Sequence, residues 1–156
     1  MAKIALFAGS FDPFTRGHEA VVEAALRLFD EVVIGVGDNL SKKGLLSVDA
    51  RCRLIEDCYK ENPRVKVAKY SSLTGDFARE VGATALVRGV RNTIDFEFER
   101  SIEAANRDLF PELTTILLIT PAEYMHVSSS LVRELLAFGR EVADYLPQNI
   151  KIENYL

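Results

Sequence analysis

The sequence predicts an α/β fold with five parallel strands in one sheet and helices on both of its faces. Short continuous apolar runs alternate with amphipathic segments from one end of the chain to the other, and this strand–helix unit recurs five times. Continuous apolar strands are typical of a parallel sheet that is covered on both sides. The 156 residues, 48% of them hydrophobic and 27% charged, suit one globular domain that spans residues 1–156.

The first half of the chain opens with two strands, each followed by a helix. Residues 3–8, KIALFA, are an apolar run and form the first expected strand. Residues 17–29 follow as a helix, because apolar side chains recur there on one side at helical spacing. Residues 31–37, EVVIGVG, form the second strand. Ser47 then caps a helix that runs to about residue 60 and ends before Pro63.

The middle of the chain repeats the pattern with shorter elements. Residues 64–70 alternate apolar and polar side chains and form the third strand. Residues 74–81 form a short helix, and Gly82 stands where a helix commonly ends in a left-handed residue. Residues 84–87, TALV, form the fourth strand, and the sequence predicts a loop from Arg88 onward.

The last third supplies the fifth strand and the C-terminal helices. Thr93 is expected to cap a helix over residues 94–109, in which Phe96 and Phe98 are expected as core or interface residues. Residues 114–119, TTILLI, form the fifth strand. The remaining elements are a helix that begins at Ser129 or Ser130 and ends at Gly139, a helical turn over residues 141–146, and a last one from Pro147.

Charge and cysteine content exclude several classes of protein. The net charge of −4 counts against a surface that coats nucleic acid, which is normally basic. Cys52 and Cys58 point in different directions on their expected helix, so neither a disulfide nor a metal site is expected from them. No apolar run approaches the ~20 residues of a membrane span, and the N-terminus is better explained as a strand than as a signal peptide. We therefore expect a cytoplasmic protein with no membrane partner.

Groups that bind phosphate follow every strand of the predicted sheet. In such sheets the ligand crevice lies outside the carboxyl ends of the strands. Hydroxyl groups, free backbone N–H groups or cations stand at each of these ends, which predicts a site for a polyphosphate. In strand order they are Ser10 and His18, then Lys42 and Lys43, then Ser71, Ser72 and Thr74, then Arg88, Gly89 and Arg91, and then Ser128, Ser129 and Ser130.

The segment GSFDPFTRGH, residues 9–18, carries the most local chemistry. Gly9 allows a sharp turn off the strand, and Thr15 can cap the following helix. His18 then falls in the first turn, where free N–H groups and the helix dipole favour an anion. The same chemistry also suits a tight strand–helix loop with a surface histidine, and the segment alone does not decide between the two.

Three further segments have a functional and a plain structural interpretation. Lys42 can neutralise phosphate, whereas Lys43 is expected to be solvated, and both can be surface charges. Arg88 and Arg91 can present two guanidinium groups to one anion, or they can be unrelated surface residues. The run from Ser128 to Ser130 can form an anion nest at the start of a helix, or it can simply cap that helix.

Taken together, these segments resemble a known family. GSFDP with TRGH, a T-x-G-H motif after the first strand, is similar to the signature of the nucleotidyltransferase superfamily related to class I aminoacyl-tRNA synthetases. SKK at residues 41–43, RGVRN with DFEFE at residues 88–99, and SSSLVRE at residues 128–134 follow in order. With the first motif they resemble bacterial phosphopantetheine adenylyltransferases over essentially the whole chain. The resemblance implies a Rossmann-like, doubly wound sheet.

The resemblance also implies a reaction and a set of site residues. ATP and 4′-phosphopantetheine would give 3′-dephospho-CoA and pyrophosphate, by in-line transfer without a covalent intermediate. The implied catalytic residues are His18, Ser10, Lys42 and Arg91, and the acceptor would bind Ser10, Lys42, Thr74 and Arg88. ATP would bind Ser10, Phe11, His18, Gly89, Val90, Arg91, Glu99, Tyr124, Met125, His126, Val127, Ser128, Ser129 and Ser130.

Within that set the resemblance gives several residues particular roles. Glu99 would bind the ribose of ATP, and His126 is not expected to be catalytic. Ser10 stands where many relatives carry Thr, and Tyr124 stands where some carry Trp. Mg²⁺ would be carried mainly by the substrate phosphates rather than by a protein site. The resemblance further implies a homohexamer built as a dimer of trimers, and CoA as a feedback inhibitor.

Two other functions compete with this one. Cytidylyltransferases for glycerol phosphate and adenylyltransferases for nicotinamide mononucleotide share the first motif, but the segments around Arg88 and Ser128 favour the pantetheine enzyme. A binding module without activity would not need the combination of His18, Lys42 and Arg91.

Overall fold

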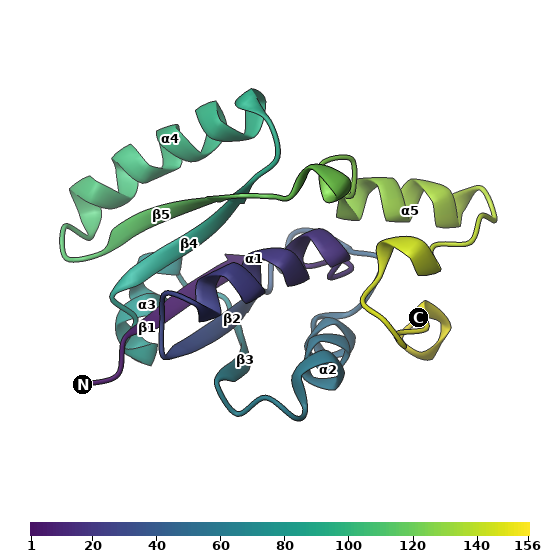
Figure 1. Cartoon of the computed structure of the whole chain (residues 1–156), viewed down its shortest axis with the longest axis horizontal. Coiled ribbons are helices and arrows are strands. Elements are labelled where there is room, and N and C mark those ends of the chain that lie inside the picture. Colours follow the sequence, from purple (N-terminus) through teal and green to yellow (C-terminus); the bar gives the residue numbers. More distant parts are fainter.

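The sheet has all five strands parallel, in the order β3-β2-β1-β4-β5. The computed structural model describes residues 1–156, and the predicted α/β architecture is confirmed (Figure 1). The strands are β1 (Ile4–Gly9), β2 (Glu31–Gly37), β3 (Val65–Tyr70), β4 (Ala85–Val90) and β5 (Thr114–Ile119). The helices are α1 (Arg16–Leu26), α2 (Val48–Tyr59), α3 (Thr74–Val81), α4 (Thr93–Leu109) and α5 (Ser129–Ala137).

The strand order places a switch in the direction of winding beside β1. The chain builds β2 and β3 on one side of β1 and then returns to build β4 and β5 on the other side. β1 pairs with β2 from Ile4 to Gly9, but with β4 only from Ala5 to Phe7. β1 and β4 therefore part at their carboxyl ends, and a ligand crevice is expected at such a switch point.

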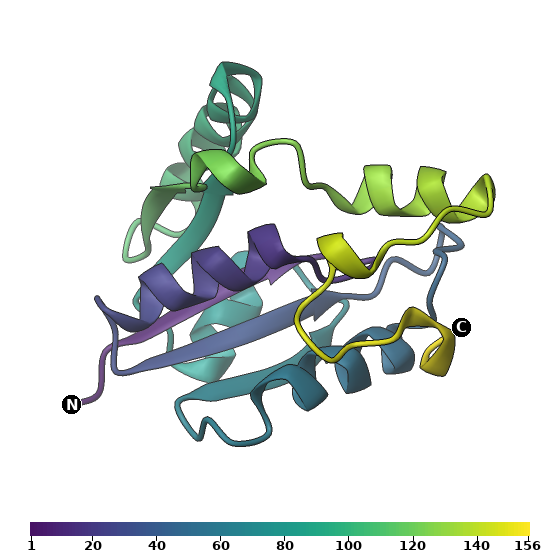
Figure 2. The ribbon, with the colours of Figure 1, turned by 45° about the vertical axis from the view of Figure 1, so that its right-hand side comes forward.

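Two apolar clusters cover the two faces of the sheet, as in a doubly wound fold. On one face Phe7 and Ile34 pack with buried side chains of α1, α2 and α5, including Leu54. On the other face Leu6 and Val33 pack with side chains of α3 and of the segment after α4. In Figure 2 α5 and the C-terminal segment lie beyond the end of the sheet toward which the strands point. Tyr155 fastens this segment to α2 by donating a hydrogen bond to Asp57.

Several predicted boundaries differ from the structure, and the fourth strand differs most. β4 runs to Val90, so Arg88 and Gly89 lie inside the strand and not in a loop after it. The extension pairs with β5 as far as Ile119, at a level where the pairing with β1 has already ended. A half-exposed strand end next to the site admits polar side chains, which is why the sequence pattern resembled a loop.

Helix ends and a few side chains also needed correction. Asn92, and not Thr93, caps α4, through a hydrogen bond from the Asp95 N–H to its side chain. Phe96 and Phe98 are 44% and 62% exposed, so they are not core residues of this chain, and their place in an interface stays a prediction. The remaining helical turns are short, at Ala122–Tyr124, Ala143–Tyr145 and Ile152–Asn154, and α1 ends at Leu26 rather than residue 29. Cys52 and Cys58 are half-buried free thiols. None of the helices is long and apolar enough to cross a bilayer.

The apolar cluster that contains Phe7, Ile34 and Leu54 should contribute much of the free energy of unfolding. Leu54 is fully buried in α2, so Leu54→Ala should lower the free energy of unfolding by about 2–5 kcal/mol through lost contacts and the cavity that remains. Urea denaturation followed by circular dichroism measures this difference. Leu28→Ala removes the same atoms from a side chain that is 56% exposed, and it should change the midpoint little. Equal losses in both variants would contradict the assignment of the core.

Candidate active site

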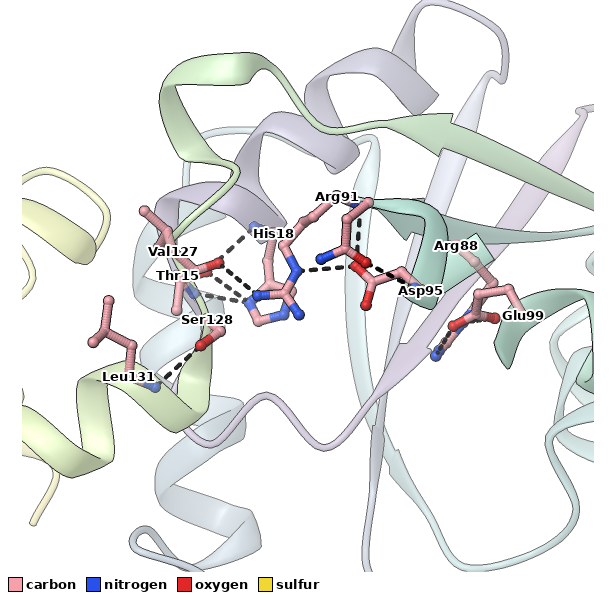
Figure 3. Close-up of polar contacts among 10 residues, drawn as sticks. Thr15, His18, Arg88, Arg91, Asp95, Glu99, Val127, Ser128 and Leu131 are labelled. Atoms are coloured by element: carbon pink, nitrogen blue, oxygen red, sulfur yellow. Dashed lines mark hydrogen bonds and ion pairs between the residues drawn. The ribbon is translucent and has the colours of Figure 1, made fainter. Parts of the chain in front are cut away.

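The N-terminus of α1 holds His18 by a reciprocal cap. The Thr15 hydroxyl accepts a hydrogen bond from the His18 N–H at 3.4 Å, and the Thr15 N–H donates to His18 Nδ1 at 3.0 Å (Figure 3). A ring nitrogen that accepts a hydrogen bond carries no proton. The neutral ring must therefore carry its proton on Nε2, which leaves a donor available to a ligand.

Aromatic rings and cations surround this imidazole. The ring centroids of Phe7, Phe11 and Phe14 lie 6.2, 5.0 and 5.3 Å from that of His18. Burial, and then the charges of Arg88 and Arg91, lower the pKa of His18 to about 3. The imidazole is therefore neutral at physiological pH. It can donate a hydrogen bond to a phosphate, but it does not act as a cation.

Both arginines of β4 and its end are oriented by carboxylates of α4. Arg88 donates from Nε and Nη2 to the two oxygens of Glu99 at 2.9 and 2.8 Å, and it also donates to the Ala8 carbonyl. Arg91 donates from its backbone N–H and from Nε to Asp95 at 3.0 and 3.1 Å. A guanidinium has five N–H groups, so each arginine retains donors for an anion while its position is fixed (Figure 3).

The serine run combines the two interpretations that its sequence allowed. Ser128 is the N-cap of α5 and accepts a hydrogen bond from the Leu131 N–H at 3.1 Å. The Ser129 hydroxyl donates to the Pro13 carbonyl at 2.7 Å, which ties the start of α5 to the loop before α1. The hydroxyls of Ser128 and Ser129 are thus structural, while Ser129 and Ser130 line the cavity from the first turn of α5, where backbone N–H groups lack helical partners and can bind an anion.

These groups line one cavity of about 350 Å³, and a second cavity of about 350 Å³ adjoins it. Arg88 and Glu99 belong to the walls of both. The first cavity is rich in hydroxyls, backbone N–H groups and guanidinium groups. The second is lined mainly by apolar side chains, which come from β1, β4 and α4 and from Leu73 and Phe110. A charged cavity and an apolar cavity therefore meet at Arg88. A shallower polar hollow beside Ser10 reaches Tyr70 and Thr74.

The structure brings most of the predicted site residues together. Thr74 lines the second cavity and the shallow hollow. Val90, Tyr124, Met125 and His126 do not line the charged cavity. The residues that do are Ser10, Phe11, His18, Arg88, Gly89, Arg91, Glu99, Val127, Ser128, Ser129 and Ser130.

Lys42 lies apart from these residues. It belongs to an exposed turn in which its N–H donates to the Asn39 carbonyl at 3.0 Å. The segment between β2 and α2 has no buried side chain before Leu46, so local sequence gives no indication of where the ammonium group rests.

Sequence reasoning gave no site role to several residues that line the charged cavity, among them Arg133 and Asp95. Arg133 donates to the Asp12 carbonyl at 2.7 Å and to the Ser130 hydroxyl at 3.2 Å. Asp95 orients Arg91. Both follow a predicted site residue at helical spacing, Arg133 three positions after Ser130 and Asp95 four after Arg91, and this spacing is the signal that could have found them.

Comparison with known proteins places the chain in a family. A family model described as cytidylyltransferase-like matches residues 6–135. The phosphopantetheine adenylyltransferase of Porphyromonas gingivalis is 49% identical over 150 residues, which cover 96% of this chain and 97% of that protein. The protein of the same name from Cytophaga hutchinsonii is 44% identical, over 96% and 100%. The chain belongs to the phosphopantetheine adenylyltransferase family.

Solved structures agree with this family at the level of the fold. A bifunctional NMN adenylyltransferase/ADP ribose pyrophosphatase from Francisella tularensis superposes with a TM-score of 0.74 at 18% identity. The match covers 97% of this chain but only 47% of that chain. A putative nicotinate-nucleotide adenylyltransferase from Vibrio parahaemolyticus gives 0.65 at 23% identity, over 94% of both chains. The predicted fold, family and nucleotidyltransferase class are confirmed, while the roles of single residues stay predictions.

The low pKa of His18 predicts that its ring does not titrate near neutrality. Its ¹⁵N and ¹³C ring signals should stay those of the neutral Nε2–H form from pH 8 down to about 5. Because an unfolded histidine titrates near 6.5, the unfolded chain binds more protons between pH 6.5 and about 3. The stability of the fold should therefore decrease as the pH falls through that window.

Nuclear magnetic resonance of ring-labelled protein measures this directly. The chain has two histidines, and His126→Gln identifies which signals belong to His18. Titration of the His18 signals with a midpoint near 6 to 7 would contradict the buried, capped geometry.

Proposed function

We propose that this chain transfers the adenylyl group of ATP to 4′-phosphopantetheine, giving 3′-dephospho-CoA and pyrophosphate. The observation that carries the proposal is the meeting of the charged cavity and the apolar cavity at Arg88. A nucleotide triphosphate needs the first, and an acceptor with a phosphate at one end and a long, weakly polar arm needs the second. The names of the related proteins supply the identity of that acceptor.

The elements of the charged cavity suggest how ATP is held. The first turn of α5, with backbone N–H groups near Ser129 and Ser130, and the Arg91 guanidinium would bind the β- and γ-phosphates. Phe11 and Gly89 line the same cavity. Val127 also lines it. We propose Val90, Tyr124, Met125 and His126 as further ATP contacts on the resemblance alone.

The acceptor would lie with its phosphate at the junction of the two cavities. Arg88 and Ser10 would bind this phosphate, and Lys42 would reach it by movement of its exposed loop. The apolar cavity, which Thr74 also lines, has the character needed for the pantetheine arm. Such an arrangement places the acceptor phosphate next to His18, where the α-phosphate of ATP is expected.

The chemistry follows from positioning rather than from acid–base catalysis. An oxygen of the acceptor phosphate attacks the α-phosphorus of ATP, the bond to the bridging oxygen breaks, and pyrophosphate leaves with the electron pair. The acceptor is already an anion, so no general base is required. His18 Nε2–H would donate a hydrogen bond to the α-phosphoryl oxygens as charge accumulates there. Lys42 and Arg91 would neutralise the remaining charge.

A magnesium ion suits this site only when the phosphates carry it. The chain has no group of three or more histidine, cysteine, aspartate or glutamate side chains that could hold a metal. The nearby carboxylates are engaged, Asp95 and Glu99 with arginines and Asp12 with backbone N–H groups. Mg²⁺ normally keeps few protein ligands, and here it would supply neutralisation of the triphosphate charge.

Further properties expected from the sequence and from its resemblance to the family are part of the same proposal. They are a single domain over residues 1–156, a homohexamer built as a dimer of trimers, feedback inhibition by CoA, a cytoplasmic location and no nucleic-acid partner. Sedimentation analysis of the purified chain tests the hexamer, and a CoA titration of the rate tests the inhibition.

A panel of substrates tests the reaction itself. Pyrophosphate release should require ATP, Mg²⁺ and 4′-phosphopantetheine together. Pairing CTP with glycerol 3-phosphate, or ATP with nicotinamide mononucleotide, should give no release above background. Release with either of these pairs, and none with phosphopantetheine, would replace the proposal by that activity. Tight ATP binding without release in any pairing would indicate a binding module.

His18 should matter for the rate more than for ATP binding. Loss of one transition-state donor typically lowers turnover on the order of 10²–10³-fold, so His18→Ala should lower kcat by about that factor. The Kd for ATP, measured by calorimetry, should change by less than about fivefold because Arg91 and α5 remain. An unchanged kcat in a folded His18→Ala variant would exclude the assigned role.

A substitution at Glu99 tests which of two roles this residue has, since the sequence and the structure suggest different ones. The resemblance implies a contact with ATP, whereas in the structure both carboxylate oxygens bind Arg88. If Glu99 positions Arg88, Glu99→Gln should raise the KM for the acceptor about tenfold or more and leave the KM for ATP nearly unchanged, since hydrogen bonds between charged groups are worth ~1.5–3 kcal/mol. Steady-state kinetics with each substrate varied decides the question. A rise confined to the KM for ATP would favour the contact with the nucleotide.

A further inference from the structure

The side chain of Arg51 donates hydrogen bonds to backbone carbonyls of three separate segments beside the active site. From α2, its Nη1 donates to the Ser10 carbonyl at 2.7 Å and to the Gly37 carbonyl at 3.1 Å, and its Nε donates to the Leu46 carbonyl at 3.3 Å. The residue is only 8% exposed and forms no ion pair. Burying a guanidinium in this way is costly, so its partners should be parts of the chain that need to be held.

Two of these carbonyls mark the ends of the loop that carries Lys42. Gly37 is the last residue of β2, and Leu46 is the first buried residue after it. Most side chains between them are exposed, so the loop has no apolar anchor of its own. Its course therefore depends on how its two ends are fixed, and Arg51 fixes both ends with a single planar group.

Asp12 also holds the Leu46 end of this loop. Its two carboxylate oxygens accept hydrogen bonds from the N–H groups of Leu45 and Leu46 at 2.8 Å each. Gly44 packs so closely that an added Cβ would stand 2.6 Å from the Asp12 carboxylate. At this end of the loop, Asp12 therefore binds the backbone N–H groups and Arg51 binds the Leu46 carbonyl.

The third carbonyl that Arg51 binds, that of Ser10, connects these loop contacts to the active site. Ser10 is exposed and lines the charged cavity, while its carbonyl is the shortest contact of Arg51. We infer that Arg51, with Asp12, is a positioning residue that sets the Lys42 loop and Ser10 in register with each other, so that both reach the acceptor phosphate. This inference rests on the proposed function for its kinetic consequences, but its geometric part is independent of that function.

Arg51→Lys tests the inference, because an ammonium group keeps the charge but cannot span three carbonyls. Small displacements of catalytic groups can cost on the order of 10²-fold in rate, and we expect kcat/KM for the acceptor to fall by about 10- to 100-fold. The KM for ATP should stay within about threefold. When Lys42→Ala is already present, Arg51→Lys should cost much less, since Arg51 acts partly through Lys42. Fully multiplicative losses in the double variant would overturn the inference.

Arg64, which is exposed whereas Arg51 is buried, offers a control with the same number of carbonyl partners at the opposite end of the sheet. Its guanidinium also donates to three backbone carbonyls, those of Leu26, Phe29 and Asp30. Arg64→Lys should therefore loosen a comparable grip without changing the kinetics by more than about twofold. Gly44→Ala would place a methyl group against the Asp12 carboxylate and so disturb its contacts with the loop. It should reproduce the kinetic pattern of Arg51→Lys, and it keeps the test available if Arg51→Lys folds poorly.

Trypsin gives a measure of the loop that needs no catalysis, because Lys42 and Lys43 are cleavage sites within it. Cleavage there should be several-fold faster in Arg51→Lys and Gly44→Ala than in the wild type or Arg64→Lys, at a temperature where all four are folded. Equal cleavage would overturn the inference whether or not the wild type is active. A wild type that releases no pyrophosphate would instead refute the proposed function, and the cleavage rates would still decide whether Arg51 holds the loop.

Discussion

The hydrogen bond from the Thr15 N–H to His18 Nδ1 determines both where the site lies and what it can do. It holds the imidazole at the N-terminus of α1 and leaves the ring proton on Nε2. To enclose this ring, Phe11 adopts a φ of 51°, a region that bulky residues rarely occupy. Its contacts with Phe7, Phe14 and His18 offset that cost. The unusual backbone conformation of Phe11, within the GSFDPFTRGH segment, is thus explained by its role in shielding His18 from water.

The same arrangement resolves how an acidic chain presents a cationic site. The net charge is −4, yet Arg88 in β4 and Arg91 just after it line one cavity together with the neutral imidazole of His18. Carboxylates of α4 hold each guanidinium in place and still leave N–H groups free. The arginines in turn lower the pKa of His18, so the centre donates hydrogen bonds without adding a titrating charge. Such fixed donors are effective because they need no reorganisation during the reaction.

Local chemistry was predictable from sequence, and long-range pairing was not. The bounds of β2, β5 and α3 agree with the prediction because apolar runs and Gly82 define them locally. β4 was cut short because Arg88 resembles the start of a loop until its pairing with β5 is known. The position of His18 followed from its motif, whereas the bonds from Arg88 to Glu99 depend on how α4 returns across the sheet. The grip of Arg51 on three distant carbonyls has no local sequence signal at all.

The charged residues that hold other groups of the site in place share a purpose. A reaction that needs no general base depends on placing two anions in line, so the protein must oppose their repulsion and fix their geometry. Asp12, Arg51, Asp95 and Glu99 would repel or miss a phosphate, and none of them is an obvious ligand. Arg51, Asp95 and Glu99 instead each fix a residue that lines the cavity, and Asp12 fixes one end of the loop that carries Lys42. In this fold the charged residues that do not bind substrate determine the positions of the residues that do. The geometry of these supporting contacts therefore matters as much as the T-x-G-H motif.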